Sequence, residues 1–149
     1  MTPNLKMSLT GILFGSMLAL GACSTTSMGR GQTWTMDTAS TVPAAEGKVK
    51  VANEKDGNTK VKLEVEHLAP PALAAETPSG TETYVVWIQP PHGDAQNVGV
   101  LEVGKNRKGS LTTVTPFKDF TVSVTLEKSP AATVPHGERV LDKRITMPS

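Results

Sequence analysis

The sequence predicts an all-β domain, an immunoglobulin-like antiparallel β-sandwich of about seven strands over residues 46–149. Short apolar stretches alternate there with turn signals rich in Gly, Pro and Asn, at intervals of about 8–12 residues. Within the stretches, apolar residues recur at every second position, and a helical period is absent. Because about 100 residues suffice for one hydrophobic core, we expect a single domain. Because a helical period is absent, we expect it to contain no helices.

The first two strands are expected to form a hairpin. Val49 and Val51 alternate with lysines, and Val61, Leu63 and Val65 alternate with lysines and glutamates. The two stretches are separated by Asp-Gly-Asn, whose residues tolerate the positive φ angles of a tight turn. Each strand therefore has one apolar and one charged face.

A central strand is predicted at residues 84–88, which are apolar on both faces and are followed by two prolines. A strand without a polar face belongs in the middle of a fold. We therefore expect its tryptophan to lie between the sheets. The residues expected to form this inter-sheet core are Tyr84, Val86, Trp87, Val122 and Val124.

The later strands follow from the same alternation. The apolar positions change phase between Val100 and Leu101, which predicts a β-bulge near Gly99. Residues 120–127 alternate most regularly, with apolar residues facing inward and polar residues, Glu127 among them, facing outward. Further strands are expected at residues 111–114 and 140–145.

The N-terminal segment has the features of a secretory signal peptide. Lys6 supplies a positive charge, and residues 7–20 form an apolar stretch too short to span a bilayer. The stretch leads into the only cysteine of the chain. The four residues at this point are Leu20, Gly21, Ala22 and Cys23.

These four residues resemble the lipobox of bacterial lipoproteins, which has the form Leu-small-small-Cys. The resemblance implies cleavage before Cys23 and attachment of lipid to its sulfur and its new amine, and three acyl chains anchor a protein stably. The alternative is an ordinary cleavable signal peptide. Ser24 follows the cysteine in place of Asp, which in Gram-negative lipoproteins favours the outer membrane over the inner. We expect a lipid-anchored protein of the cell envelope that faces the periplasm.

Three segments are therefore expected: a lipoprotein signal peptide at residues 1–22, the lipidated cysteine and a flexible tether at 23–45, and the sandwich at 46–149. The tether is rich in Ser, Thr, Ala and Gly and has no hydrophobic period. Trp34 and Met36 are bulky apolar residues within it. They are expected either to add a short first strand or to rest at the membrane surface.

The charge balance gives no reason to expect nucleic-acid binding. Lys6 is one of 15 basic residues and lies in the signal peptide, which leaves 14 basic against 14 acidic residues and no net charge. Nucleic-acid recognition depends on neutralising phosphates with excess positive charge. The basic run at residues 105–108 is expected to be a solvated turn.

No motif of the chain predicts a cofactor or a catalytic group. Residues 104–110 have the spacing of a phosphate loop but lack the lysine before the serine and join two strands, so a turn is expected. Glu64 and Glu66 stand between lysines on an outward face, where cross-strand charge pairing is the expected role. No nucleophile elbow and no Ser-His-Asp grouping occurs. We expect no enzyme and no cofactor.

A metal site is the weakest of the candidate chemistries. His67, His92 and His136 are too far apart in sequence to form a local metal motif. If two loops met at one end of the sandwich, His92, Asp94 and His136 would bind a metal weakly. We expect instead that these histidines lie in turns and bind no metal.

A second set of motifs runs through the later strands. The positions concerned are Tyr84 and Trp87, Gly99 and Gly109, Ser129 and Pro130, and Gly137 before Val140 and Leu141. At these positions most of residues 58–141 resembles the extracytoplasmic C-terminal domain of anti-sigma-K-type factors and related uncharacterised envelope proteins. The shared motifs are structural, so the resemblance implies a fold more than an activity.

The sequence thus predicts a non-catalytic, membrane-anchored envelope lipoprotein that acts as a structural or protein-interaction module. Its expected partners are the membrane, through the N-terminal lipid, and an envelope protein bound at loop tips or at an exposed sheet edge. The resemblance to anti-sigma domains implies an alternative, a periplasmic sensing accessory of such a signalling system. A weakly metal-binding or metal-dependent protein is a lesser alternative.

Overall fold

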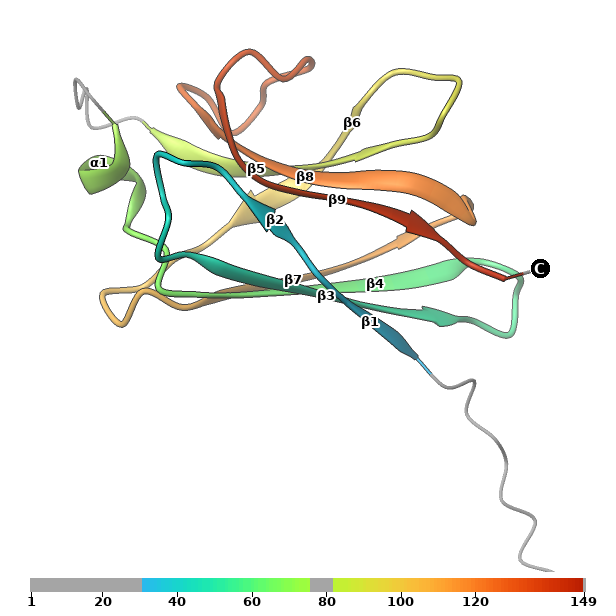
Figure 1. Ribbon diagram of the computed structural model, residues 1–149. Helices are drawn as coiled ribbons and strands as arrows, with labels where there is room; N and C mark the ends of the chain where they lie inside the picture. Colours follow the sequence, from blue (N-terminus) through green and yellow to red (C-terminus); the bar gives the residue numbers. More distant parts are fainter. Residues whose placement is uncertain (1–30, 76–81, 149) are drawn as a thin grey trace, which may run out of the picture.

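Nine strands and one helical turn make up the computed structural model, which describes residues 31–75 and 82–148 (Figure 1). The strands are β1 (Gln32–Thr35), β2 (Asp37–Thr38), β3 (Glu46–Asn53), β4 (Thr59–Glu66), β5 (Thr83–Gln89), β6 (Gln96–Leu101), β7 (Gly109–Thr115), β8 (Asp119–Glu127) and β9 (Glu138–Thr146). The helix α1 (Pro71–Ala74) is a single turn between β4 and β5. Within the described residues, no helix is long and apolar enough to cross a membrane.

The strands form two antiparallel sheets that pack face to face. The four-stranded sheet has the order β1-β3-β4-β7, and the five-stranded sheet has the order β2-β9-β8-β5-β6. Hairpins join β3 to β4, β5 to β6 and β8 to β9, and the remaining connections cross between the sheets. The predicted all-β antiparallel sandwich is confirmed, with nine strands where the sequence indicated about seven.

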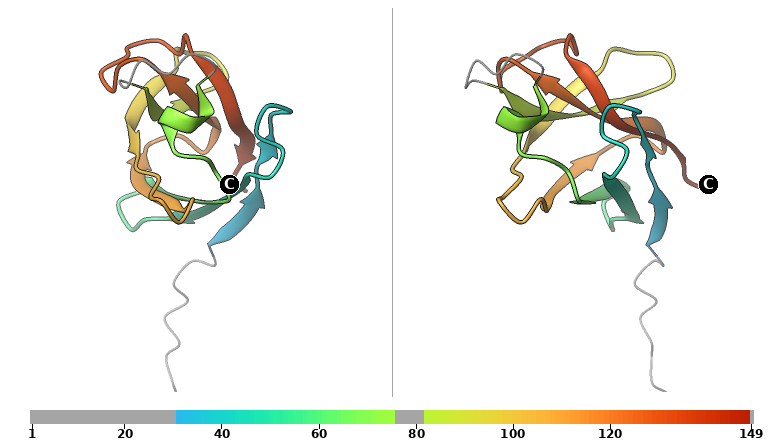
Figure 2. Two further views of the ribbon diagram at one scale, coloured as in Figure 1. Left: turned by 90° about the vertical axis from the view of Figure 1, so that its left-hand side faces the viewer. Right: turned by 60° about the vertical axis from the view of Figure 1, so that its left-hand side comes forward.

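The two additional strands come from one N-terminal segment that belongs to both sheets. β1 pairs with β3, and β2 pairs with β9, so the chain passes from one sheet to the other at Met36, which is buried. Figure 2 shows this segment along one side of the sandwich. Residues 32–38, which lie within the predicted tether of residues 23–45, therefore belong to the sandwich, and Trp34 lies in β1. Four residues and then two are too few to show a strand period in the sequence.

The hairpin predicted from Asp-Gly-Asn is confirmed. β3 and β4 pair along their whole length, and the apolar residues of both strands face the other sheet. In the turn, the Asp56 carboxylate accepts hydrogen bonds from the backbone N–H of Asn58 at 3.0 Å and from its side-chain amide at 2.8 Å. These bonds lower the pKa of Asp56 below its ordinary value.

The core between the sheets contains four of the five residues assigned to it. Tyr84, Val86, Val122 and Val124 are all buried there, packed with the apolar residues of β3 and β4. The Tyr84 hydroxyl donates a hydrogen bond to the Ala69 carbonyl oxygen at 2.8 Å. This bond satisfies the polar end of a ring that is otherwise enclosed by apolar side chains.

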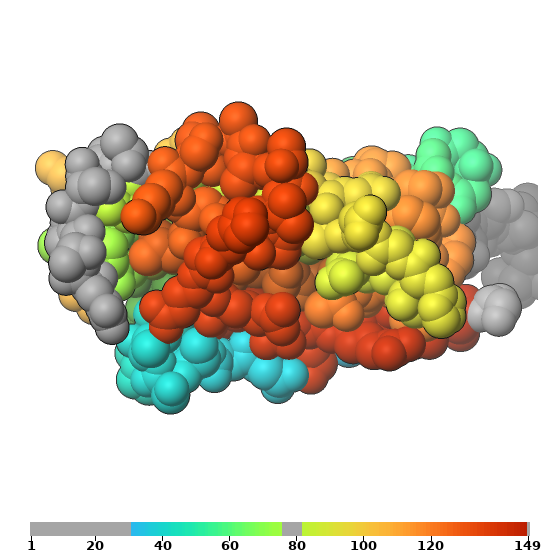
Figure 3. All heavy atoms as spheres, turned by 90° about the horizontal axis from the view of Figure 1, so that it is seen from above, coloured from blue at the N-terminus to red at the C-terminus, as the bar shows by residue number. Residues whose placement is uncertain are grey.

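Trp87 is buried on the other face of its sheet. Successive residues of a strand point to opposite faces, so when Tyr84 and Val86 face the four-stranded sheet, Val85 and Trp87 face away from it. The loop between β8 and β9 covers this outer face (Figure 3). The assignment of Trp87 to the inter-sheet core is therefore wrong, although its burial is complete. Sequence alternation shows that both faces of β5 are covered but does not show by what.

A β-bulge interrupts β6 where the sequence changes phase. Val86 pairs with Gly99 and Trp87 with Asn97, so Val98 has no partner on β5. Gly99 has a φ of 134°, a conformation that side-chain-bearing residues rarely adopt. The predicted bulge near Gly99 is confirmed.

Candidate binding surface

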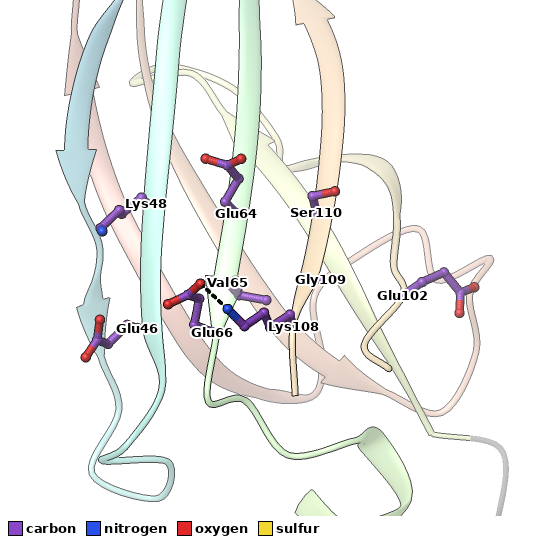
Figure 4. Close-up of a pocket in the computed structure, with 9 residues that line it drawn as sticks. All are labelled: Glu46, Lys48, Glu64, Val65, Glu66, Glu102, Lys108, Gly109 and Ser110. Carbon is purple, nitrogen blue, oxygen red and sulfur yellow. Dashed lines mark hydrogen bonds and ion pairs between the residues drawn. The ribbon is translucent and has the colours of Figure 1, made fainter. Parts of the chain in front are cut away.

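A hollow of about 580 Å³ lies on the outer face of the four-stranded sheet (Figure 4). Glu46, at the hollow, is the first residue of β3, whereas Gln32 at the start of β1 pairs with Val51 near the other end of β3. The hollow and the start of β1 therefore lie at opposite ends of the sheet. The residues that line it are Glu46, Lys48, Glu64, Val65, Glu66, Glu102, Lys108, Gly109 and Ser110.

The strand register brings these side chains together. Glu46 stands opposite Glu66, Lys48 opposite Glu64, and Glu64 opposite Ser110 on the third strand. Directly opposed like charges such as Glu46 and Glu66 destabilise a sheet. Lys108 offsets this repulsion, since its ammonium lies 2.7 Å from the Glu66 carboxylate.

The two glutamates of β4 are held in their ionised form by lysines. Glu64 accepts hydrogen bonds from Lys62 at 2.8 Å and from Lys50 at 3.1 Å, and these bonds lower its pKa below the ordinary value. The hydrogen bond and charge of Lys108 likewise lower the pKa of Glu66. The expected cross-strand pairing is thus present. A carboxylate with a lowered pKa holds no proton near neutral pH, so neither glutamate suits a general-acid role.

Two carboxylates of the hollow remain without partners. The side chains of Glu46 and Glu102 form no hydrogen bond or ion pair with any described residue. Four acidic and two basic side chains line the hollow, which gives it a formal charge of −2. It contains no histidine, and its only hydroxyl is that of Ser110. The arrangement therefore suits binding of cationic or hydrogen-bond-donating groups.

A buried polar chain lies on the opposite side of the molecule, under the β8–β9 loop. The Trp87 indole N–H donates to the Thr125 hydroxyl at 2.8 Å, and that hydroxyl donates to Glu127 at 2.6 Å. Glu127 also accepts the backbone N–H groups of His136 at 3.1 Å and Gly137 at 3.0 Å. The first two bonds join β5 to β8 within the sheet, and the last two tie the loop to the sheet. Glu127 therefore has a structural role.

This chain of bonds shows that the outward-facing polar residues predicted for β8 are covered. Ser123, Thr125 and Glu127 do point away from the inter-sheet core, but all three are buried. The side-chain amide of Asn97 donates to the carbonyl oxygens of Pro130 and Ala132 at 3.0 and 2.9 Å and so holds the far side of the loop. Alternation of polar and apolar residues predicts that the polar face of a strand is exposed to solvent. The pattern does not show whether a loop covers that face.

The residues considered for a metal site are not brought together. His92 and Asp94 lie in the turn that follows the end of β5. The backbone of His136 is bonded to Glu127, which pairs with Thr83 at the start of β5. The two loops are thus at opposite ends of the strand. Among residues 31–75 and 82–148, no group of three or more His, Cys, Asp or Glu side chains could hold a metal ion.

The segment with phosphate-loop spacing forms a turn. The backbone N–H of Arg107 donates to the Gly104 carbonyl oxygen at 2.9 Å, and the N–H of Gly104 donates to the Lys108 carbonyl oxygen at 3.1 Å. β7 follows at once at Gly109, so no helix N-terminus is present to point amides at a phosphate. The solvated turn predicted for residues 105–108 is confirmed.

The residues of the lipobox, Leu20, Gly21, Ala22 and Cys23, lie outside the described residues. Comparison with models of known protein families gave no match, and comparison with characterised proteins gave none either. Among solved structures, the crystal structure of the clock protein EA4 is similar with a TM-score of 0.48 and 11% sequence identity, over 82% of this chain and 97% of that chain. A similarity at this level indicates nothing about ligands or partners.

Proposed function

We propose that this chain is a membrane-anchored envelope lipoprotein whose β-sandwich is a non-catalytic protein-interaction module. The sequence of residues 20–23 supports the anchor. β1 begins at Gln32, only nine residues after Cys23, and nine residues span at most about 30 Å when fully extended. A lipid on Cys23 would therefore hold the domain close to the membrane.

The hollow on the four-stranded sheet is the observation that carries the interaction role. β3 is eight residues long, so Glu46 at its start lies about 23–24 Å from Asn53 at its end. The hollow is thus separated from the anchored end of the domain by the length of the sheet. Its unpaired Glu46 and Glu102 offer negative charge to a partner with cationic or hydrogen-bond-donating groups.

Metabolic labelling with a palmitate analogue tests the anchor. We expect the wild-type protein to take up the label, and the Cys23→Ser variant to take up none and to remain uncleaved at this site. Ser24→Ala is the matched control and should be labelled like the wild type. Unlabelled wild-type protein that is released into the soluble fraction would contradict the proposal.

Site-specific photo-crosslinking in intact cell envelopes tests the interaction surface. A photoreactive residue at Lys48, which lines the hollow and leaves both unpaired carboxylates in place, is expected to give a discrete adduct, and one at Thr33, exposed on β1, is expected to give none. Charge reversal by Glu46→Lys should weaken the adduct at position 48. Equal adducts at both positions, or no effect of the reversal, would count against the hollow as the binding surface.

A further inference from the structure

The four sheet edges of the sandwich differ in how they are protected against pairing with another strand. β1 has four residues and β2 has two, so neither offers a long ladder. β6 is interrupted by its bulge, and its Asn97 is engaged with the β8–β9 loop. Short strands and bulges are the means by which proteins block edge-to-edge association. The fourth edge, β7, has neither.

β7 is seven residues long, regular and uncharged. Its sequence, Gly-Ser-Leu-Thr-Thr-Val-Thr, contains no lysine and no proline, and its register with β4 is unbroken. Val103 bridges Gly109 at the start of the edge. Beyond that point β7 has no strand partner on its outer side within the described residues, and Val114 is 52% exposed. The unpaired backbone N–H and C=O groups of such an edge can form hydrogen bonds with a further strand.

The free part of this edge is symmetric about Thr112. In an antiparallel pair of two β7 strands centred on Thr112, Ser110 of one copy stands opposite Val114 of the other, and both face outward. Gly109 is already bridged by Val103, and its counterpart in this register would be Thr115, so five residues of each copy pair. Two exposed Val114 side chains are then partly covered, and no charged side chain lies in the new ladder.

Charges on the neighbouring strand β4 do not oppose the same two-fold arrangement. Lys60 stands opposite Val114, and Glu64 stands opposite Ser110. Pairing about Thr112 therefore places Lys60 of each copy on the row of Glu64 of the other. The Lys62 side chains of the two copies share the central row, and each is bound to its own Glu64. Both the Lys60–Glu64 and the Lys62–Lys62 pairs are separated by three strand spacings of about 4.8 Å each, so neither attraction nor repulsion between them is strong.

We propose that the β7 edge binds a second copy of this chain, forming a two-fold symmetric dimer with a continuous eight-stranded sheet of order β1-β3-β4-β7-β7-β4-β3-β1. The interface is isologous, with residues 110–114 of each copy paired around Thr112. This pairing uses only the sandwich and does not depend on a lipid at Cys23.

Disulfide cross-linking of the full chain tests the register. All variants carry Cys23→Ser, so that the introduced cysteine is the only thiol and the result is independent of lipidation. Thr112→Cys should give a disulfide-linked dimer under mild oxidation. Lys62→Cys, on the same face but one strand further in, should not. A mixture of Ser110→Cys and Val114→Cys chains should give the mixed dimer in preference to either homodimer.

Sedimentation equilibrium of the same Cys23→Ser chain provides the second measurement. Thr112→Lys places two like charges opposite each other on the two-fold axis, which should weaken dimerisation by up to about fivefold. The free energy of unfolding should fall by no more than about 1 kcal/mol, because the side chain of Thr112 is exposed, although the new lysine stands opposite Lys62 of its own copy. A monomer at all concentrations, equal cross-linking at positions 112 and 62, or a dimer unaffected by Thr112→Lys would each overturn the proposal.

Discussion

Trp87 and Glu127 are joined through a single hydroxyl group, that of Thr125, at distances of 2.8 and 2.6 Å. The two side chains lie on adjacent strands, on the face of the five-stranded sheet that points away from the core. Glu127 also accepts hydrogen bonds from the backbone of the β8–β9 loop. The bonds therefore hold the loop over the outer face of the five-stranded sheet, where Trp87 is buried.

Removal of the Glu127 carboxylate is expected to release this loop. Glu127→Ala leaves the Thr125 hydroxyl and the backbone N–H groups of His136 and Gly137 without their acceptor, which should lower the free energy of unfolding by about 2–4 kcal/mol. Chemical denaturation measures the loss, and limited proteolysis should cut within residues 128–137. Glu102→Ala, at an unpaired exposed side chain, is the control and should stay within about 0.5 kcal/mol of wild type. A stable, protease-resistant Glu127→Ala variant would show that the loop is held by other contacts.

The indole of Trp87 should report a fully enclosed environment. Trp34 is the only other tryptophan, so in a Trp34→Phe background the emission comes from Trp87 alone and should be blue-shifted. Trp87→Ala should cost about 3–5 kcal/mol, as for other buried aromatic residues. Trp87→Phe should cost less, because it keeps most of the packing and loses the bond to Thr125. A solvent-exposed emission spectrum in the Trp34→Phe variant would contradict the covered outer face.

Gly137 is required by its close approach to the preceding strand. A Cβ atom at this position would overlap the backbone carbonyl oxygen of Leu126, while the Gly137 N–H must stay in place for Glu127. Gly137→Ala should therefore destabilise the domain by about 1–3 kcal/mol, as overpacking does. Gly31→Ala is the matched control, since its added Cβ makes only ordinary contacts. Equal stability of the two variants in thermal unfolding would refute the steric argument.

Tyr84 should titrate at unusually high pH. Burial, assisted by the negative charge of Glu138, raises its pKa to about 12. Tyr84 is the only tyrosine of the chain, so tyrosinate absorbance follows it directly and should rise about two pH units above the ordinary midpoint near 10. A normal midpoint in a protein that is still folded would contradict its burial.

The same shift predicts a loss of stability in alkali. A group whose pKa is raised in the folded state favours folding below its unfolded pKa, and this contribution is lost as the pH rises from about 10 to about 12. The full loss is about 2–3 kcal/mol. Tyr84→Phe should make the free energy of unfolding less dependent on pH in this range than it is in the wild type.

The sequence was sufficient to predict the strands whose two faces differ in polarity. The β3–β4 hairpin and the bulge at Gly99 follow from local patterns, because turn residues and changes of phase are written in neighbouring positions. Trp87 was misplaced because its bonded partner, Thr125, is 38 residues away in sequence, and the loop over this face is held there by Glu127. The hollow was missed for a similar reason. Glu46, Glu66 and Lys108 meet only through the register of three strands.

The passage of one N-terminal segment through both sheets has a mechanical consequence. A pulling force applied to the chain ahead of Gln32 enters β1, which is bonded antiparallel to β3, and continues through Met36 into β2, which is bonded to β9. Directed along the strands, such a load acts on several backbone hydrogen bonds at once and does not break them one after another. This first segment is thereby suited to resist unfolding when the chain is pulled from the N-terminal side of Gln32.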